Sequence, residues 1–325
     1  HVKLRYGGHP SYAALIWDSA DEGVFDDCEI SFSGSRGAYL RYGSSLSLQR
    51  CQIHHTALAA LDLSDGNCRV DLGDVEFSEH RGFAIEGLHP LNLPRLLGNQ
   101  FHAAPRPGIS LLGYTYDAPD SVLEDLGTPY ILSGTQGVSA SASLTLQPGT
   151  VVKANANTGF YVTGRLVAQA ANAPPIIFSS SADDELFGDS NGDGATSAAP
   201  SGWAGIRVYG GSASAHLENV QIRYAAAGAQ SGISVENGAY TEFRDGLLWN
   251  NSVGVNCSYS SGVLTNSEVT RNEFGLRLNN CAGFTIGGSL DTRNTLMANT
   301  TQAVFNASAP SVDATYNYWG DRTGP

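Results

Sequence analysis

Residues that favour helices are scarce in this chain. Its 325 residues contain one Met and only two Lys, whereas Gly occurs 38 times. Ser, Asn, Thr, Val and Ile are prominent, and such a composition favours β-strands joined by tight turns. No stretch of ten or more residues shows the 3.6-residue hydrophobic period of a helix, which argues against an α-helical repeat protein.

Basic residues are also few. Lys and Arg together number 18 against 31 Asp and Glu, which gives a net charge of −13. This balance argues against a nucleic-acid partner and against binding to an anionic membrane, because both need clustered cations. No apolar run approaches the length that a transmembrane helix requires, so we expect no membrane insertion. The excess of acid favours a secreted protein.

Cysteine is rare and odd in number: Cys28, Cys51, Cys68, Cys257 and Cys281. Their spacing matches no zinc pattern and predicts no disulfide framework. The first residues show no signal-peptide pattern, and residues 1–6 are expected to form a strand. We therefore expect the chain to begin inside a longer polypeptide.

A repeat of about 24 residues runs along the chain. Its marker, the second apolar residue of a short strand, recurs first at Leu4, Ile30, Ile53, Phe77 and Phe101, and later at Ile222, Leu248, Val269 and Leu296. Short strands at one long period stack in parallel, coil upon coil. The sequence thus predicts an all-β, right-handed parallel β-helix of roughly 13 coils.

Stacking turns each position of the repeat into a column of side chains. Cys28 and Cys51 lie two residues before their markers, so we expect them to be neighbours in the core. Asp27, Arg50 and Asp74 are predicted to form a ladder of alternating charge on the surface. Three residues after their markers lie Asn251, Asn272 and Asn299, which predict a structural asparagine ladder at a turn.

Several segments resemble secreted bacterial parallel β-helix repeat proteins of the pectate-lyase-like superfamily. The resemblance rests on Leu-Thr-Leu-Gln-Pro-Gly-Thr-Val-Val-Lys at residues 144–153, on Trp-Ala-Gly-Ile-Arg-Val at 203–208 and on Tyr-Asn-Tyr-Trp-Gly at 316–320. It implies a right-handed β-helix at the bacterial cell surface. It does not imply one activity, because this superfamily includes lyases, hydrolases, epimerases and adhesins.

A longer repeat suggests two units. Val2-Lys3-Leu4-Arg5-Tyr6 at the start of the chain recurs in similar form as Val220-Gln221-Ile222-Arg223-Tyr224. We therefore expect residues 1–117 to be the tail of a preceding unit and residues 118–325 to be a second unit. That second unit carries an excursion at residues 180–202.

The excursion contains Asp-Ser-Asn-Gly-Asp-Gly at residues 189–194. Alternating oxygen ligands with a glycine at the sixth position match the first half of a calcium loop, but Pro200 at the twelfth position excludes an EF-hand. The alternative is a solvated acidic turn. We predict a structural calcium ion held by Asp183, Asp184, Asp189, Asn191 and Asp193.

Two other clusters are candidates for chemistry. His54, His55, Glu79, His80 and His102 form the first, and surface residues are the interpretation favoured over a zinc site. His54 and His102 are too far apart to share a metal unless His55 or Glu79 joins them. The second cluster would suit a polysaccharide-cleaving enzyme and consists of Arg50 with Asp27 and Asp74, or of Arg244 and Asp245 with Glu268 and Arg271. Strand alternation explains these residues as a surface ladder instead, so we predict no catalytic residue.

Aromatic residues offer a further surface. Tyr rings on a β-helix face can stack on sugars, and the candidates are Tyr39, Tyr42, Tyr114, Tyr116, Tyr161, Tyr209, Tyr240 and Tyr259. We expect a non-catalytic extracellular stalk, adhesin or filament module that binds glycans or associates end to end with other copies. The alternative is a secreted polysaccharide lyase or glycoside hydrolase.

Overall fold

The chain folds as an all-β parallel β-solenoid of about 12 turns, with about 24 residues per turn. The computed structural model describes residues 2–9, 12–18, 21–65, 67–225, 231–281, 283–307 and 311–320. Within these ranges helix is limited to two short 3-10 segments, η1 (Pro90–Arg95) and η2 (Leu290–Thr292). No helix in this part of the chain has the length and apolarity needed to cross a membrane. The β-solenoid predicted from the repeat is therefore confirmed.

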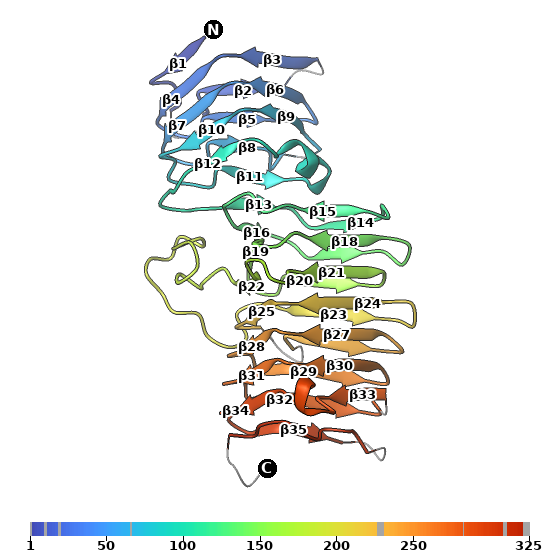
Figure 1. Ribbon diagram of the computed structural model, residues 1–325. Coiled ribbons are helices and arrows are strands. Elements are labelled where there is room, and N and C mark those ends of the chain that lie inside the picture. The colour runs from blue at the N-terminus through green and yellow to red at the C-terminus, as the bar shows by residue number, and fades with distance from the viewer. Residues whose placement is uncertain are drawn as a thin grey trace. The chain divides into compact units, whose positions relative to one another are not determined.

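Two compact units make up the chain. The first consists of His1–Tyr114, Leu126–Gly134 and Ala182–Ser197, and the second of Thr115–Asp125, Thr135–Ser181 and Ala198–Pro325. In both units a turn of the solenoid contributes short strands to parallel sheets, and strands of successive turns lie side by side (Figure 1). Strand β14 (Tyr114–Tyr116) spans the residue at which the two units divide.

The first unit contains three sets of stacked strands. The first set is β1 (Lys3–Arg5), β4 (Glu29–Ser33), β7 (Gln52–Thr56), β10 (Glu76–Ser78) and β12 (Gln100–Phe101). The second is β2 (Leu15–Trp17), β5 (Ala38–Leu40), β8 (Leu61–Asp62), β11 (Ile85–Leu88), β13 (Ile109–Leu111) and β16 (Tyr130–Leu132). The third is β3 (Glu22–Asp26), β6 (Ser45–Gln49) and β9 (Arg69–Gly73).

The second unit also contains three sets. One is β15 (Ser121–Leu123), β18 (Ser143–Leu146), β21 (Arg165–Gln169), β24 (Ser214–Glu218), β27 (Tyr240–Arg244), β30 (Ser261–Thr265) and β33 (Gly283–Ile286). Another is β17 (Gln136–Val138), β20 (Gly159–Val162), β23 (Gly205–Tyr209), β26 (Ile233–Glu236), β29 (Val253–Ser258), β32 (Phe274–Asn279) and β35 (Gln302–Asn306). The last is β19 (Val151–Ala154), β22 (Ile176–Ser180), β25 (Val220–Arg223), β28 (Leu247–Trp249), β31 (Glu268–Thr270) and β34 (Thr295–Met297).

The apolar markers of the repeat face each other in the strand register. Leu4 pairs with Ile30, Ile30 with Ile53, and Phe77 with both Ile53 and Phe101. In the second unit Ile222, Leu248, Val269 and Leu296 follow one another in the same way. Most of these side chains are fully buried, so in each unit a column of apolar residues helps to hold successive turns together.

The cysteines differ from the prediction in one respect. Cys257 and Cys281 form a disulfide across 24 residues, about one turn of the second unit, where the sequence predicted no disulfide framework. Cys28, Cys51 and Cys68 are free and buried. Cys28 lies beside Cys51 as expected, and burial raises the pKa of the Cys51 thiol.

Asn251, Asn272 and Asn299 lie in consecutive turns and form a hydrogen-bonded ladder. Asn272 Oδ1 accepts from the backbone N–H and the Nδ2 of Asn251 at 2.9 and 3.0 Å, and Asn272 Nδ2 donates to Asn299 Oδ1 at 3.0 Å. A second ladder, which the sequence did not predict, joins Ser267, Asn294 and Asn317. Both ladders satisfy buried backbone groups at the corners of the turns.

Candidate functional site

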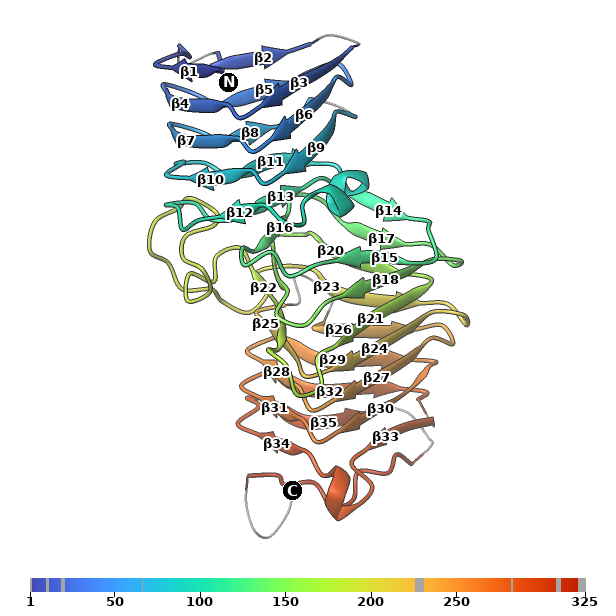
Figure 2. The same ribbon diagram turned by 45° about the horizontal axis from the view of Figure 1, so that its top comes forward.

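The regular stacking of the first unit is interrupted after β9. In the next turn, after β11, the chain forms η1 in place of another strand, and η1 packs beside β9 (Figure 2). The segment reads Pro-Leu-Asn-Leu-Pro-Arg. Proline lacks the N–H group that a strand needs for its ladder, so this segment cannot extend the sheet. The outer surface is therefore hollowed beside η1.

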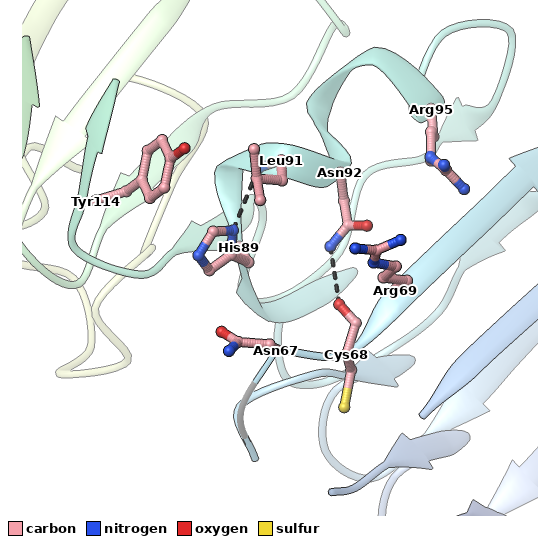
Figure 3. Close-up of a pocket in the computed structure, with 8 residues that line it drawn as sticks. All are labelled: Asn67, Cys68, Arg69, His89, Leu91, Asn92, Arg95 and Tyr114. Atoms are coloured by element: carbon pink, nitrogen blue, oxygen red, sulfur yellow. Dashed lines mark hydrogen bonds between the residues drawn. The ribbon is translucent and has the colours of Figure 1, made fainter. Parts of the chain in front are cut away.

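This hollow is a pocket of about 500 Å³, within the size range of small-molecule sites. Among the described residues that line it there is no carboxylate. Figure 3 shows His89 and Tyr114 on one side and Arg69 and Arg95 on the other. The lining residues are Asn67, Cys68, Arg69, His89, Leu91, Asn92, Arg95 and Tyr114.

Buried Asn92 anchors the backbone around Arg69. Its Nδ2 donates to the Cys68 carbonyl at 3.1 Å, and its Oδ1 accepts from the Val70 N–H at 3.2 Å. The amide thus holds the backbone on both sides of Arg69, and it joins η1 to β9. The point at which the Arg69 side chain leaves the backbone is therefore fixed relative to η1.

An imidazole and a phenol form the opposite wall. His89 Nδ1 accepts from the Leu91 N–H at 3.3 Å and so caps η1. The His89 ring packs edge-on against Tyr114, with 4.8 Å between centroids. Burial lowers the pKa of His89, which favours the neutral ring at pH 7. This wall presents an aromatic surface that ends in polar atoms.

The two guanidinium groups of the pocket are not neutralised. Neither Arg69 nor Arg95 has an ion pair with another described residue, and both are exposed. The same two residues border a second hollow of about 300 Å³, whose lining includes Glu22 and Asp71. Arg69 and Arg95 thus lie between a first hollow whose described lining has no carboxylate and a second hollow that Glu22 and Asp71 also line. Of the residues that line the first hollow, the sequence pointed only to Tyr114 and Cys68. The other lining residues come together because η1 interrupts the pattern of strands.

Three of the five predicted calcium ligands come together. Asp184, Asp189 and Asp193 each offer a carboxylate oxygen, and these oxygens lie within 4.8 Å of one another. Asp189 accepts from the N–H groups of Gly192 and Gly194 at 2.6 and 2.9 Å, which closes the loop. Asp184 Oδ1 is shielded from solvent and has no hydrogen-bond partner among the described residues. Such an oxygen is available to a cation.

Of the other two predicted ligands, Asn191 lies against the cluster and Asp183 is buried. Asn191 donates to Asp193 through Nδ2 at 2.8 Å, and its Oδ1 accepts from the Asp193 N–H at 3.3 Å. Asp183 is buried, and its carbonyl accepts from the Leu186 N–H at 3.2 Å. The loop belongs to the first unit, where Arg106 Nε donates to the Ser190 carbonyl at 3.0 Å.

The histidine cluster divides into three parts. His54, His55 and Glu79 lie together, with their ligand atoms within 4.8 Å of one another. His102 pairs with Glu76 at 3.1 Å. His80 is buried, its ring bonds the Gly82 carbonyl at 2.7 Å, and burial lowers its pKa. The sequence left a metal site open at His54 and His102 if His55 or Glu79 joined them, and the structure groups His55 and Glu79 with His54, whereas His102 pairs with Glu76.

The candidate catalytic groups have partners other than those expected. Arg50 pairs with Asp26, not with Asp27 or Asp74, because Asp27, Arg50 and Asp74 all occupy left-handed turn positions with φ of 52–54°. Arg244 on β27 contacts Glu218 at 3.1 Å and Glu242 at 3.5 Å, whereas Glu268 lies on β31, in a different set of strands. His216 adds a contact to Glu242 at 3.2 Å.

This patch on β24 and β27 was missed because the markers of the repeat lie on other strands of the same turns, β25 and β28. The register of β24 with β27 places His216 opposite Glu242, and Glu218 opposite Arg244. Aligning residues 214–218 with residues 240–244 would have revealed it. A shallow hollow of about 370 Å³ lies beside Glu218 and Asp245.

The tyrosine candidates also have different surroundings. Tyr116 is buried, whereas Tyr42 and Tyr259 are exposed. Tyr161 and Tyr209 stack at 6.2 Å between centroids, with Arg207 over both rings. Tyr114 is the candidate that lines the pocket at η1.

Comparison with protein-family models, with curated proteins and with solved structures found no match for the chain.

Proposed function

We propose that this chain is a non-catalytic structural and adhesive module of an extracellular protein at the bacterial cell surface, and that the pocket at η1 binds an acidic glycan. Charged side chains on its outer faces often pair with the next turn. Examples are Arg5 with Glu29 at 2.7 Å and Arg207 with Glu236 at 2.8 Å. Such pairs satisfy one another and support a scaffold. End-to-end association with other copies stays a prediction.

The Cys257–Cys281 disulfide supports an extracellular location. Disulfides form and persist in oxidising compartments and are rare in reducing ones. The three free cysteines are buried, which protects their thiols from exchange.

The observation that carries the adhesive role is the convergence of Arg69 and Arg95 on a pocket whose described lining has no carboxylate. A guanidinium matches the geometry of a carboxylate or sulfate, which it binds through two hydrogen bonds. Tyr114 and His89 supply an aromatic face for the apolar side of a sugar ring. A uronic acid or sulfated sugar would satisfy both walls.

The glycan proposal predicts a loss of binding when either guanidinium is removed. We expect Arg69→Gln and Arg95→Gln each to weaken binding of oligogalacturonate or chondroitin sulfate by roughly tenfold to a hundredfold, since a charge-assisted hydrogen bond contributes about 1.5–3 kcal/mol. Calorimetry or glycan arrays would measure this. Arg81→Gln, which changes an exposed Arg away from the pocket, is the matched control. Equal affinity of all three variants, or equal binding of a neutral dextran, would contradict the proposal.

A polysaccharide lyase or glycoside hydrolase is the second candidate. The patch on β24 and β27 favours it, because Glu218, Glu242 and Arg244 bring two carboxylates and a guanidinium together. The same polysaccharides should be incubated with the chain and monitored for ultraviolet-absorbing unsaturated products and for new reducing ends. Turnover that Arg244→Gln abolishes would establish the enzyme and overturn the non-catalytic module.

We also propose that a calcium ion stabilises the loop at residues 182–197. Calcium should protect this loop from proteolysis, and a chelator should reverse the effect. Asp184→Asn and Asp189→Asn should each remove the protection, because each deletes a charged ligand. Asp120→Asn, at an exposed position elsewhere, is the control. Protection that persists in both loop variants, or no effect of calcium on the unchanged chain, would show that the loop is a solvated acidic turn.

A further inference from the structure

Four side chains from three successive turns of the first unit, Glu29, His54, His55 and Glu79, form a continuous row of polar contacts. His54 Nε2 lies 3.5 Å from a Glu29 oxygen, and His55 Nε2 lies 2.7 Å from a Glu79 oxygen. Between them, His54 Nδ1 faces His55 Nδ1 at 2.7 Å. Each imidazole therefore has one nitrogen toward a carboxylate and the other toward its neighbour.

The positions of the hydrogens make the contact between His54 and His55 unusual. A carboxylate accepts hydrogen bonds, so each Nε2 is best satisfied when it carries a hydrogen. In a neutral imidazole, Nδ1 is then a bare lone pair. Two lone pairs that face each other at 2.7 Å repel, so this tautomer needs a cation at the nitrogens; otherwise one Nδ1 carries a hydrogen and donates it to the other. A metal ion meets this need and leaves both rings neutral.

The flanking carboxylates have the arrangement that orients metal-binding histidines. A histidine ligand usually donates its other N–H to a carboxylate, which fixes the tautomer and makes the free nitrogen a better ligand. Arg5 holds Glu29 through two hydrogen bonds of 2.8 and 2.7 Å, and Lys3 lies at 3.1 Å. Glu29 is thus an anchored carboxylate beside His54, and the exposed Glu79 lies against Nε2 of His55.

The rings are also confined and reachable. Phe32 lies against His55 with 4.5 Å between centroids, and 5.9 Å from His54, so it restricts both imidazoles. The side chain of His55 is 41% exposed and that of His54 is 19% exposed, which leaves an approach for an ion and its water ligands.

We propose that His54 and His55 bind a zinc ion through their Nδ1 atoms, with Glu29 and Glu79 as positioning residues and water in the remaining positions. Zinc–nitrogen bonds of about 2.0–2.1 Å require the two Nδ1 atoms to separate slightly from their present distance, which small ring rotations allow. The ion would link the side chains of three turns. This inference does not depend on glycan binding.

The test is a calorimetric titration of the chelator-treated full chain with zinc, in buffer that contains calcium to saturate oxygen sites. We expect one zinc ion to bind and the melting temperature to rise. His54→Gln and His55→Asn should each weaken binding at least a hundredfold. Asn tolerates the left-handed turn that His55 adopts, with φ of 54°. Glu29→Gln and Glu79→Gln should weaken it by about tenfold to a hundredfold.

His102→Gln is the matched control, because His102 also lies on the outer surface and pairs with a glutamate, Glu76. It should bind zinc as the unchanged chain does. Circular dichroism of each variant confirms that the fold is retained. No zinc binding by the unchanged chain, or undiminished binding by the folded His54→Gln and His55→Asn variants, would overturn the proposal.

Discussion

Replacing Asn272 with Ala is expected to lower the free energy of unfolding by about 2–6 kcal/mol, because it leaves buried polar groups without partners at about 1–3 kcal/mol each. Asn272 is completely buried. Its Nδ2 donates to the Leu248 carbonyl at 3.0 Å, and its Oδ1 accepts from the Asn251 N–H at 2.9 Å. Alanine satisfies neither group, and solvent has no access to a fully buried corner of the solenoid.

Denaturant unfolding followed by circular dichroism would measure this loss. The control is Asn256→Ala, which makes the same chemical change on β29 at a partly exposed position. We expect it to alter stability by no more than about 0.5 kcal/mol. Equal stabilities of the two variants would show that the asparagine ladder adds nothing to the stability of the second unit.

Loss of the disulfide is expected to be nearly as costly. The Cys257–Cys281 bond closes a loop of 24 residues, and the chain-entropy relation assigns such a loop about 3.5 kcal/mol of stabilisation. The double variant Cys257→Ala, Cys281→Ala should therefore unfold at lower temperature and lower denaturant concentration than the unchanged chain. The bond acts mainly by restricting the unfolded chain.

Reduction provides an internal check on this expectation. A reducing agent should destabilise the unchanged chain and have no effect on the double variant. Cys68→Ala, which alters a free buried cysteine, should leave the response to reduction intact. If reduction left the unchanged chain as stable as before, the disulfide would contribute little to the fold.

The repeat was predictable because apolar burial imposes one period on the whole chain. The markers that share a phase in the sequence are register partners in the structure, as Leu4, Ile30 and Ile53 show. The longer repeat has a local counterpart. Tyr6 and Tyr224, which end its two matching segments, both occupy left-handed turns with φ of 56° and 57°. Similar short-range sequence therefore produces similar turns. A tandem array in a longer protein stays a prediction.

The partners of surface charges were not predictable with the same precision. Arg50 was expected to pair with Asp27, in the same column of the preceding turn, but it pairs with Asp26. The period places a residue to within one position. At a corner of the solenoid, where the backbone enters the left-handed region, one position changes the direction of the side chain completely.

The amino-acid sequence by itself determined the strand composition, the period of about 24 residues and the inward columns, because these follow from apolar alternation along the chain. Only the tertiary structure decided which polar side chains meet. The pocket at η1, the His54–His55 contact with its flanking glutamates and the Cys257–Cys281 bond all join residues from different turns. Successive turns differ in length, as the unequal spacing of the register partners Leu248, Val269 and Leu296 shows. The length of each loop sets which side chains face one another, and that length has no pattern in the sequence.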